Sequence, residues 1–572
     1  MITVHGIKLK LGTSTDKLLR KTERLLGLEA GAIDSVRIVK ESLDAREKPV
    51  LYRVFSLELV SRKSDESLIE ACDRANIRCT AENPVRFEIK PLQRHPEGRP
   101  AVVGFGPCGM FAALALAEYG LRPVVLERGG CMEERIAAVE RFWNGGPLDP
   151  ECNVQFGEGG AGTFSDGKLT TGTKSPYSHW IMERFADAGA SPQILYKQKP
   201  HIGTDVLRSV VVNIRKKIEA LGGEVRFGCR LTEVITEDGA VRGIRYIQNG
   251  SEKMLGTDTV VLALGHSARD TMRELYAEGL KMEQKPFSMG VRIEHPQSLI
   301  DLAQYGALHE DLGIGPADYK LNVKTASGRG VYTFCMCPGG YVIDASSVPG
   351  MTAVNGMSNS DRGSGTANSA LLADVLPEDY AADNAASEEP FSAAHPEERG
   401  DHPLTGVAFQ EKYEQLAYNL GGGKPPKQTV GSFLGKGPGA AGERTTSADT
   451  GCDRPAAAQT DLTKCLPGFV SDALREALPK LGRKLKGFDS PDALLTAIES
   501  RSSSPVRIKR DSETLQAIAG PHASGNSAAP FAENALIHGL YPAGEGAGYA
   551  GGIMSAAADG VRIAVKITER SV

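Results

Sequence analysis

Three glycines in the segment from Val102 to Gly129 have the spacing of a turn that binds a dinucleotide. Gly104, Gly106 and Gly109 follow a run of small apolar residues and precede a helical stretch that includes Pro107 and Cys108. Gly104 permits a tight turn, Gly106 lets backbone approach a pyrophosphate, and Gly109 lets the helix pack close to a sheet. The helix N-terminus offers unpaired N–H groups to phosphates.

A carboxylate stands where such a turn needs one. Glu127 ends the second apolar run, 23 residues after Gly104, and Arg128 follows it. A carboxylate at this distance accepts the hydroxyls of an adenosine ribose. The order strand, turn, helix, strand and acid therefore predicts a dinucleotide site, without separating FAD from NAD.

A second glycine cluster runs from Asn153 to Leu169. Glycine weakens helix and strand alike, so this run predicts a loop whose backbone N–H groups converge on phosphate or on a flat ring. Hydrogen-bonding residues are interleaved with its glycines. The residues that we predict to contact the cofactor here are Gly159, Gly160 and Thr163.

A third motif closes the chain, between residues 539 and 566. A short strand ends at Gly544-Glu545, and a glycine loop leads into a helix that begins near Gly552, Ile553 and Met554. Small residues let this helix end lie against a ring system, and its N–H groups suit the negative charge of a reduced flavin. Because NAD needs no such second site, FAD is the better ligand. Gly265, at the end of a buried strand, completes the predicted cofactor contacts.

The residues that could act on a substrate lie between these motifs. On a regular strand the sulfurs of Cys335 and Cys337 face the same way, so they could form a redox pair or lie over the flavin. Two small buried residues are the plainer alternative. Arg292 and Arg507 are cations that could bind an anionic substrate, or they could be structural. No spacing pattern predicts a metal site.

These motifs need elements to position them, and the chain is long enough for several domains. Its pattern predicts an α/β fold with a Rossmann-like FAD-binding domain, an inserted α+β substrate domain and an N-terminal ferredoxin-like α+β domain. The predicted boundaries are 1–95 for the N-terminal domain, 97–285 and 535–572 for the two parts of the FAD-binding domain, and 286–534 for the inserted domain.

Some local patterns make specific predictions. We expect strands near Val85 to Ile89, from Gly223 to Ile235, and from Val331 to Ala345 with a break at Pro338. Ser490-Pro491 predicts a helix over residues 492–500. The segments 376–402 and 435–460 are rich in small and polar residues, which favours exposed loops.

Composition sets the remaining bounds. The net charge of −5, with 41% hydrophobic and 24% charged residues, is ordinary for a globular protein and gives no clear sign of nucleic-acid binding. No stretch reaches the length of a membrane span, and the expected location is the cytoplasm. The ten cysteines are then expected to be mostly free thiols. Nothing in the composition fixes the oligomeric state.

The three motifs together resemble flavoproteins with a glutathione-reductase-like FAD fold. In that superfamily, the glycine turn, an Ala-Thr-Gly-like strand end and a Gly-Asp motif build one FAD site. This chain has Leu264 where threonine is usual and Glu545 where aspartate is common. More specifically, NVQFGEGGAGTFSDGKL, GVRIEHP, CMCPGGYV, SSSPVRI and LYPAGEGAGYAGGI resemble a bacterial family of uncharacterised FAD-dependent dehydrogenases. The resemblance spans nearly the whole chain and implies no substrate.

The leading functional hypothesis is an FAD-dependent oxidoreductase that passes a hydride through flavin N5 to or from an unknown small molecule. No second dinucleotide unit is convincing, and the Cys-x-x-x-x-Cys signature of disulfide reductases is absent, although NAD(P)H could bind transiently. One alternative is an accessory or redox-sensing flavoprotein whose N-terminal domain binds protein or RNA through residues such as Lys8 and Lys40. Another is a flavin-linked reductase of unsaturated or isoprenoid substrates.

Overall fold

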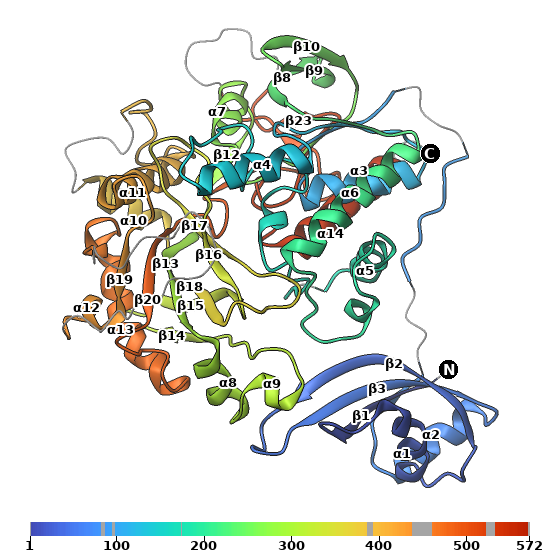
Figure 1. Ribbon diagram of the computed structural model, residues 1–572. Coiled ribbons are helices and arrows are strands. Elements are labelled where there is room, and N and C mark those ends of the chain that lie inside the picture. The colour runs from blue at the N-terminus through green and yellow to red at the C-terminus, as the bar shows by residue number, and fades with distance from the viewer. Residues whose placement is uncertain are drawn as a thin grey trace.

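The computed structural model describes residues 2–81, 86–93, 98–172, 174–385, 393–436, 460–521 and 532–569. Residues 2–80 form a small unit at one side of a larger body (Figure 1). Two sheets organise that body, one parallel and one antiparallel. Within the described ranges, no helix is both long enough and apolar enough to cross a bilayer.

The N-terminal unit is an antiparallel sheet of order β2-β3-β1-β4, and both of its helices pack on one side of it. The predicted order of elements is present, but the last strand is not where we expected it. It pairs with β1 directly after the second helix, whereas 86–89 form no strand and Val85 lies outside the described residues. The elements are β1 (Ile2–Lys10), α1 (Leu18–Leu25), β2 (Ile33–Asp44), β3 (Tyr52–Ser61), α2 (Asp65–Arg74) and β4 (Cys79–Thr80).

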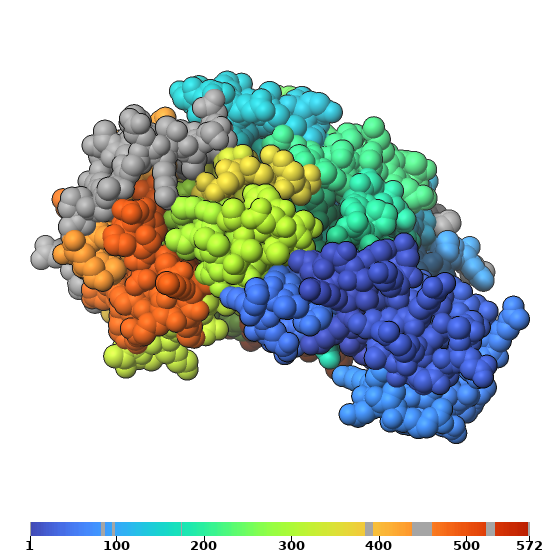
Figure 2. Space-filling view, turned by 60° about the horizontal axis from the view of Figure 1, so that its bottom comes forward, coloured from blue at the N-terminus to red at the C-terminus, as the bar shows by residue number. Residues whose placement is uncertain are grey.

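Strand β2 joins this unit to the larger body. The backbone N–H of Glu41 donates to Tyr196 O at 2.8 Å, and Gln198 N–H donates to Glu41 O at 2.7 Å. Lys48 Nζ donates to Ala303 O at 2.6 Å. In the space-filling view the unit lies against the body beside the segment that contains Ala303 (Figure 2).

The parallel sheet has the order β24-β11-β5-β6-β7, and its three central strands are fully buried runs of Val, Leu and Ala. Such runs are expected for parallel strands that are covered on both faces. Helices α3, α5, α6 and α14 share a core on one face (Figure 1). The elements are β5 (Ala101–Val103), α3 (Pro107–Glu118), β6 (Val124–Leu126), α4 (Met132–Trp143), α5 (Ser178–Asp187), α6 (Thr204–Ala220), β7 (Glu224–Arg226), β11 (Val260–Leu262), α7 (Arg269–Ala277), β24 (Leu540–Pro542) and α14 (Ile553–Glu569).

Helices α3 and α14 pack very closely at Gly560. A Cβ at this position would lie 2.2 Å from the backbone oxygen of Cys108. Because α3 follows β5 and α14 follows β24 in a parallel sheet, both helices begin at the same edge, beyond the carboxyl ends of the strands. The close contact at Gly560 fixes the distance between these two helix starts.

The second large sheet is antiparallel and has the order β14-β15-β18-β13-β20-β19. Helices α11 and α13 bury their apolar sides against it. Its strands are β13 (Phe287–Pro296), β14 (Asn322–Lys324), β15 (Gly330–Cys337), β18 (Thr366–Val375), β19 (Lys427–Thr429) and β20 (Leu494–Glu499). The helices around it are α8 (Gln297–Tyr305), α9 (His309–Leu312), α10 (Pro377–Ala385), α11 (Thr405–Gly421), α12 (Val430–Phe433) and α13 (Gly468–Lys484).

Short sheets complete the body. Strands β8 (Cys229–Glu237), β9 (Ala240–Gln248) and β10 (Ser251–Gly256) form an antiparallel sheet, with the turn predicted at Asp238-Gly239. The other pairs are β12 (Met282–Gln284) with β21 (Val506–Ile508), β16 (Tyr341–Asp344) with β17 (Val354–Met357), and β22 (Ala517–Ile518) with β23 (Leu536–Ile537).

The break predicted at Pro338 is present and separates β15 from β16, which belong to two different sheets. Three local predictions were wrong. Residues 494–499 form β20 rather than a helix, because β13 and β19 pair with both of its edges. The strand predicted from Gly223 to Ile235 breaks at Gly228, which has a φ of 65°. The loop predicted at 376–402 contains α10. Most of the loop predicted at 435–460 lies outside the described residues.

Candidate functional site

The glycine turn has the close contacts that its sequence predicts. Gly104 has a φ of 100°, and a Cβ there would lie 2.3 Å from Ala263 O. A Cβ at Gly109 would lie 1.9 Å from Gly104 O. Any side chain at either position would push β5, α3 and β11 apart, so both glycines are needed for the turn.

Glu127 connects the first two glycine motifs. Its carboxylate accepts hydrogen bonds from the backbone N–H groups of Phe105 at 2.8 Å, Gly129 at 3.0 Å and Gly157 at 2.9 Å. The side chain is nearly buried but still lines the cavity described below. The carboxylate therefore orders the turn in addition to any contact with a ribose.

The second glycine cluster lies against the first. A Cβ at Gly160 would lie 2.7 Å from the Cα of Gly106. Arg135, on α4, is fully buried beneath the cluster and donates to the backbone oxygens of Asn153 at 2.9 Å and Glu158 at 2.7 Å. Burial lowers the pKa of this guanidinium to about 10. Sequence reasoning did not identify Arg135, because nothing in its helical surroundings distinguishes it from an exposed arginine.

The closing motif brings a carboxylate and an imidazole together. Glu545 Oε1 lies 3.5 Å from Nδ1 of His266, which follows the Gly265 turn. Burial raises the pKa of Glu545 to about 7, and burial together with Arg501 lowers the pKa of His266 to about 3. The imidazole is therefore neutral, and its buried Nε2 has no hydrogen-bond partner among the described residues. From its sequence context alone, His266 is expected to be a polar loop residue after the Gly265 turn, and only the fold places it beside Glu545.

One cavity of about 860 Å³ joins these motifs to the antiparallel sheet. The predicted residues that line it are Gly104, Gly106, Pro107, Cys108, Glu127, Arg128, Gly160, Gly265, Cys335, Glu545, Gly552, Ile553 and Met554. Those that do not line it are Gly109, Gly159, Thr163, Arg292, Cys337, Arg507 and Gly544. Four of this second group, Gly109, Gly159, Thr163 and Gly544, are in the three motifs and contact the residues around the cavity.

The two predicted substrate cations have other partners. Arg292 is fully buried, and its Nη1 lies 3.2 Å from Oε2 of Glu499 on β20. Arg507 Nη1 lies 3.7 Å from Glu283, and its guanidinium lies 5.5 Å from the Tyr549 ring centre. Neither guanidinium faces the cavity, which favours the structural alternative for both.

Further charged side chains line the cavity, and three of them matter for the substrate side. Lys168 is one of the hydrogen-bonding residues of the second glycine cluster, whereas sequence reasoning missed Glu499 and Arg501. Burial raises the pKa of Glu499 to about 7 despite the Arg292 cation. Arg501 is fixed by the buried Glu414, whose Oε2 lies 2.7 Å from its Nη2. Glu499 was missed because its strand was predicted as a helix.

The arrangement fits FAD. Gly551 and Gly552 have open space where a Cβ would stand, so a flat group has access to the start of α14. The first N–H groups of α3 and α14 are available for an anion or a polarised carbonyl. The unpartnered Nε2 of His266 adds a neutral hydrogen-bonding group in the same cavity.

Comparisons with known proteins agree with this fit. Residues 286–502 match the family "FAD-dependent protein, C-terminal domain-like", and residues 1–55 match a domain of unknown function. An uncharacterised protein of Clostridium beijerinckii is 40% identical over 580 residues, which cover 100% of this chain and 99% of the relative.

Solved flavoprotein structures have only weak similarity. A quinol fumarate reductase variant from E. coli has a TM-score of 0.33 at 12% identity, covering 84% of this chain and 71% of that chain. The glycerol-3-phosphate dehydrogenase from Bacillus halodurans complexed with FAD has a TM-score of 0.25 at 12% identity, covering 49% of this chain and 47% of that chain. The aligned region is thus less than half of the dehydrogenase, and such scores do not establish a common fold.

The family match identifies the cofactor as FAD, in agreement with the glycine motifs and the cavity. The relative extends the similarity over the N-terminal unit and both large sheets. This chain belongs to the same family as the Clostridium beijerinckii protein, and it is an FAD-dependent flavoprotein.

Proposed function

We propose that this protein is an FAD-dependent oxidoreductase whose substrate binds between the glycine motifs and the antiparallel sheet. We further propose that its FAD site has a glutathione-reductase-like architecture. The observation that carries the proposal is the continuity of one cavity. Its lining includes the helix starts of α3 and α14 together with Cys335, Glu499 and Arg501. A molecule bound beside these three side chains has direct access to the cofactor end of the same space.

Bound FAD supplies two-electron hydride chemistry at N5. The protein's own residues hold the cofactor and provide charge. Glu127 would accept ribose hydroxyls, the N–H groups that begin α3 would hold the phosphates, and those that begin α14 would hold the ring carbonyls. On the substrate side, Glu499 is an acid that exchanges a proton near pH 7, since burial raises its pKa to about 7. Lys168 and Arg501 add positive charge to the same wall.

Anaerobic titration of the purified yellow protein tests this function. Absorbance near 450 nm is followed while NADH, NADPH or a reduced protein donor is added. Loss of the flavin band with one of these donors is the expected result, and NADH or NADPH acting so would make a nicotinamide the transient electron donor. A flavin that none of the three reduces would contradict the proposal and favour an accessory flavoprotein.

The charged residues help to choose between substrate classes. An isoprenoid substrate requires an extended apolar pocket beside the flavin. Lys168, Glu499 and Arg501 would place three charged side chains against such a chain, and covering them with an apolar molecule costs desolvation even though Arg292 and Glu414 pair with the last two. A compact polar substrate suits this wall better.

A further inference from the structure

Strand β15 contains a bulge that separates the two cysteines. Phe334 pairs with Ala370 and Cys337 pairs with Asn368, so β15 has one more residue than β18 between these pairs. Cys335 lies in the left-handed region with a φ of 44°, which is uncommon for a residue with a side chain. As a result Cys335 lines the cavity, whereas Cys337 is fully buried behind it. The sequence interpretation that both sulfurs face the same way on a regular strand is wrong in this respect.

The buried Arg292 side chain contacts both cysteine residues of the bulge. Its Nη2 donates to Cys335 O at 2.9 Å and lies 3.7 Å from Cys337 Sγ. The Cys337 thiol also donates to Cys335 O, at 3.2 Å. An unusual conformation at a functional site persists only where its surroundings fix it. Here one buried cation contacts both cysteine residues.

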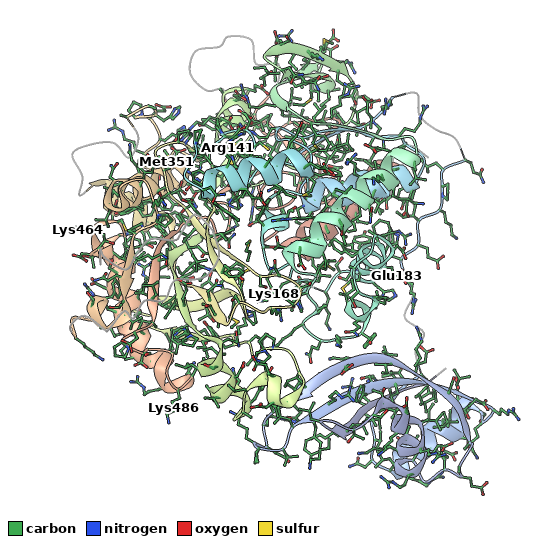
Figure 3. All side chains as sticks on the ribbon, in the orientation of Figure 1. Arg141, Lys168, Glu183, Met351, Lys464 and Lys486 are labelled. Atoms are coloured by element: carbon green, nitrogen blue, oxygen red, sulfur yellow. The ribbon has the colours of Figure 1, made fainter. Side chains whose placement is uncertain are left out.

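The two thiols have opposite acidities. The interaction with the Cys337 side chain, aided by the Lys168 and Arg292 cations, lowers the pKa of the Cys335 thiol to about 7. The same interaction, together with burial, raises the pKa of Cys337. Lys168 enters from the second glycine cluster and lies between that side of the molecule and the antiparallel sheet (Figure 3). The accessible sulfur is therefore the better nucleophile, and the buried one stays protonated.

We propose that Cys335 and Cys337 are a redox-active dithiol that reduces a small disulfide bound in the cavity and forms an intrachain disulfide in return. The Cys337 sulfur lies 3.2 Å from Cys335 O, so the two residues already contact each other across the bulge. The proposal rests on the oxidoreductase function because reduced FAD must return the electron pair.

The sulfur exchange balances without another reagent. The Cys335 thiolate attacks one sulfur of the substrate disulfide, which forms a mixed disulfide and releases a thiolate. Cys337 gives its proton to that leaving thiolate and then attacks Cys335 Sγ, which releases the second substrate half as a thiolate. The dithiol has lost two electrons and the substrate has gained them. Two electrons and two protons, the electrons from reduced FAD, regenerate the two thiols.

The number of electrons that the holoprotein takes up tests whether Cys335 and Cys337 are a redox-active pair. The oxidised protein, with FAD bound, is titrated anaerobically with dithionite while the flavin band is recorded. We expect four electrons per FAD for the wild type and two for Cys337→Ser. Cys465→Ser is the matched control, because Cys465 is also fully buried but does not line the cavity. It should still take four electrons. An uptake of two electrons by the wild type would overturn the proposal.

Peptide mapping gives an independent readout that does not depend on flavin reduction. Reduced holoprotein is treated with 5,5′-dithiobis(2-nitrobenzoic acid) and digested, and the mass of the peptide that contains both cysteines is measured by mass spectrometry. The expected products are a Cys335–Cys337 disulfide in the wild type and a stable thionitrobenzoate adduct on Cys335 in Cys337→Ser. Adducts on both cysteines of the wild type, or no reaction at Cys335, would refute the dithiol.

The two proposals fail in distinguishable ways. If no donor reduces the flavin but the mapped disulfide forms, the oxidoreductase function fails and the dithiol remains. If a donor reduces the flavin and only two electrons are taken up, the dithiol fails and the oxidoreductase function remains. Lys168→Met tests whether the lysine cation activates Cys335. At pH 7 the Cys335 thiol of the wild type should react with 5,5′-dithiobis(2-nitrobenzoic acid) about fivefold faster than that of the variant.

Discussion

Replacing Gly560 with alanine tests whether the contact between α3 and α14 sets the cofactor site. The new Cβ would lie 2.2 Å from Cys108 O and 3.1 Å from Ala112 N. Ordinary contacts begin near 3.4 Å, so the two helix starts must separate by roughly 1 Å. The obstacles are backbone atoms of α3, which cannot rotate away.

Two opposing effects decide whether Gly560→Ala stabilises or destabilises the protein. Alanine is a better helix former than glycine by about 1 kcal/mol. Overpacking a close contact costs about 1–3 kcal/mol, and a backbone clash of this size belongs at the upper end. The net loss is therefore about 2 kcal/mol. Both helix starts line the cavity, so part of the binding free energy of FAD must be used to bring them back together. We therefore expect FAD affinity to fall by about tenfold or more.

The assay compares thermal melting and FAD affinity, the latter from the quenching of flavin fluorescence. Gly468→Ala is the control, because Gly468 begins α13 and a Cβ there meets nothing within 4 Å. This variant should melt at or slightly above the wild-type temperature and bind FAD normally. The reasoning is refuted if Gly560→Ala binds FAD like the wild type and melts no lower than Gly468→Ala.

Three further substitutions test other parts of the site and its support. Glu414→Gln leaves Arg269 and Arg501 buried without their carboxylate, so urea unfolding should show a loss of about 3–5 kcal/mol, against less than about 1 kcal/mol for the exposed Glu476→Gln. His266→Leu removes a neutral hydrogen-bonding group, and fluorescence should show a roughly 2–10-fold weaker FAD complex, with equal loss at pH 5 and pH 6, because pKa values of about 3 for His266 and about 7 for Glu545 leave both groups neutral there; a loss confined to pH 5 would contradict the neutral assignment. Burial raises the pKa of Glu278 to about 8, so the native state holds its proton more tightly than the unfolded chain and stability falls as pH rises towards 8. Glu278→Gln should therefore raise the melting temperature by about a few degrees at pH 9 and by much less at pH 4.5, because the unfolded chain releases this proton only above its ordinary pKa; an equal change at both values would argue against this titration.

The cofactor half of the cavity was predictable because its signals are local. A glycine turn, a helix start and an acid at a fixed distance each depend on residues that are close in the chain. Gly104, Glu127 and Gly552 all line the cavity as the spacing suggests. What the spacing could not reveal is the second use of Glu127, whose carboxylate accepts three backbone N–H groups from two separate motifs.

The substrate half depends on contacts between distant segments. Glu499 reaches the cavity through β20, a strand that follows helix-like sequence signals and exists because β13 and β19 pair with it. Arg501 is fixed by Glu414 from α11. Neither partner is close in sequence, so no local pattern could have identified these side chains.

The two cysteines show how a single extra residue changes the chemistry. Alternation on a regular strand would give both sulfurs the same exposure and therefore similar reactivity. The bulge instead turns Cys335 towards the cavity and Lys168, while Cys337 stays buried against Arg292. A dithiol needs this inequality, because one sulfur must meet the substrate and the other must wait for the mixed disulfide. Removing one residue from the bulge should therefore abolish sulfur exchange even though both cysteines remain.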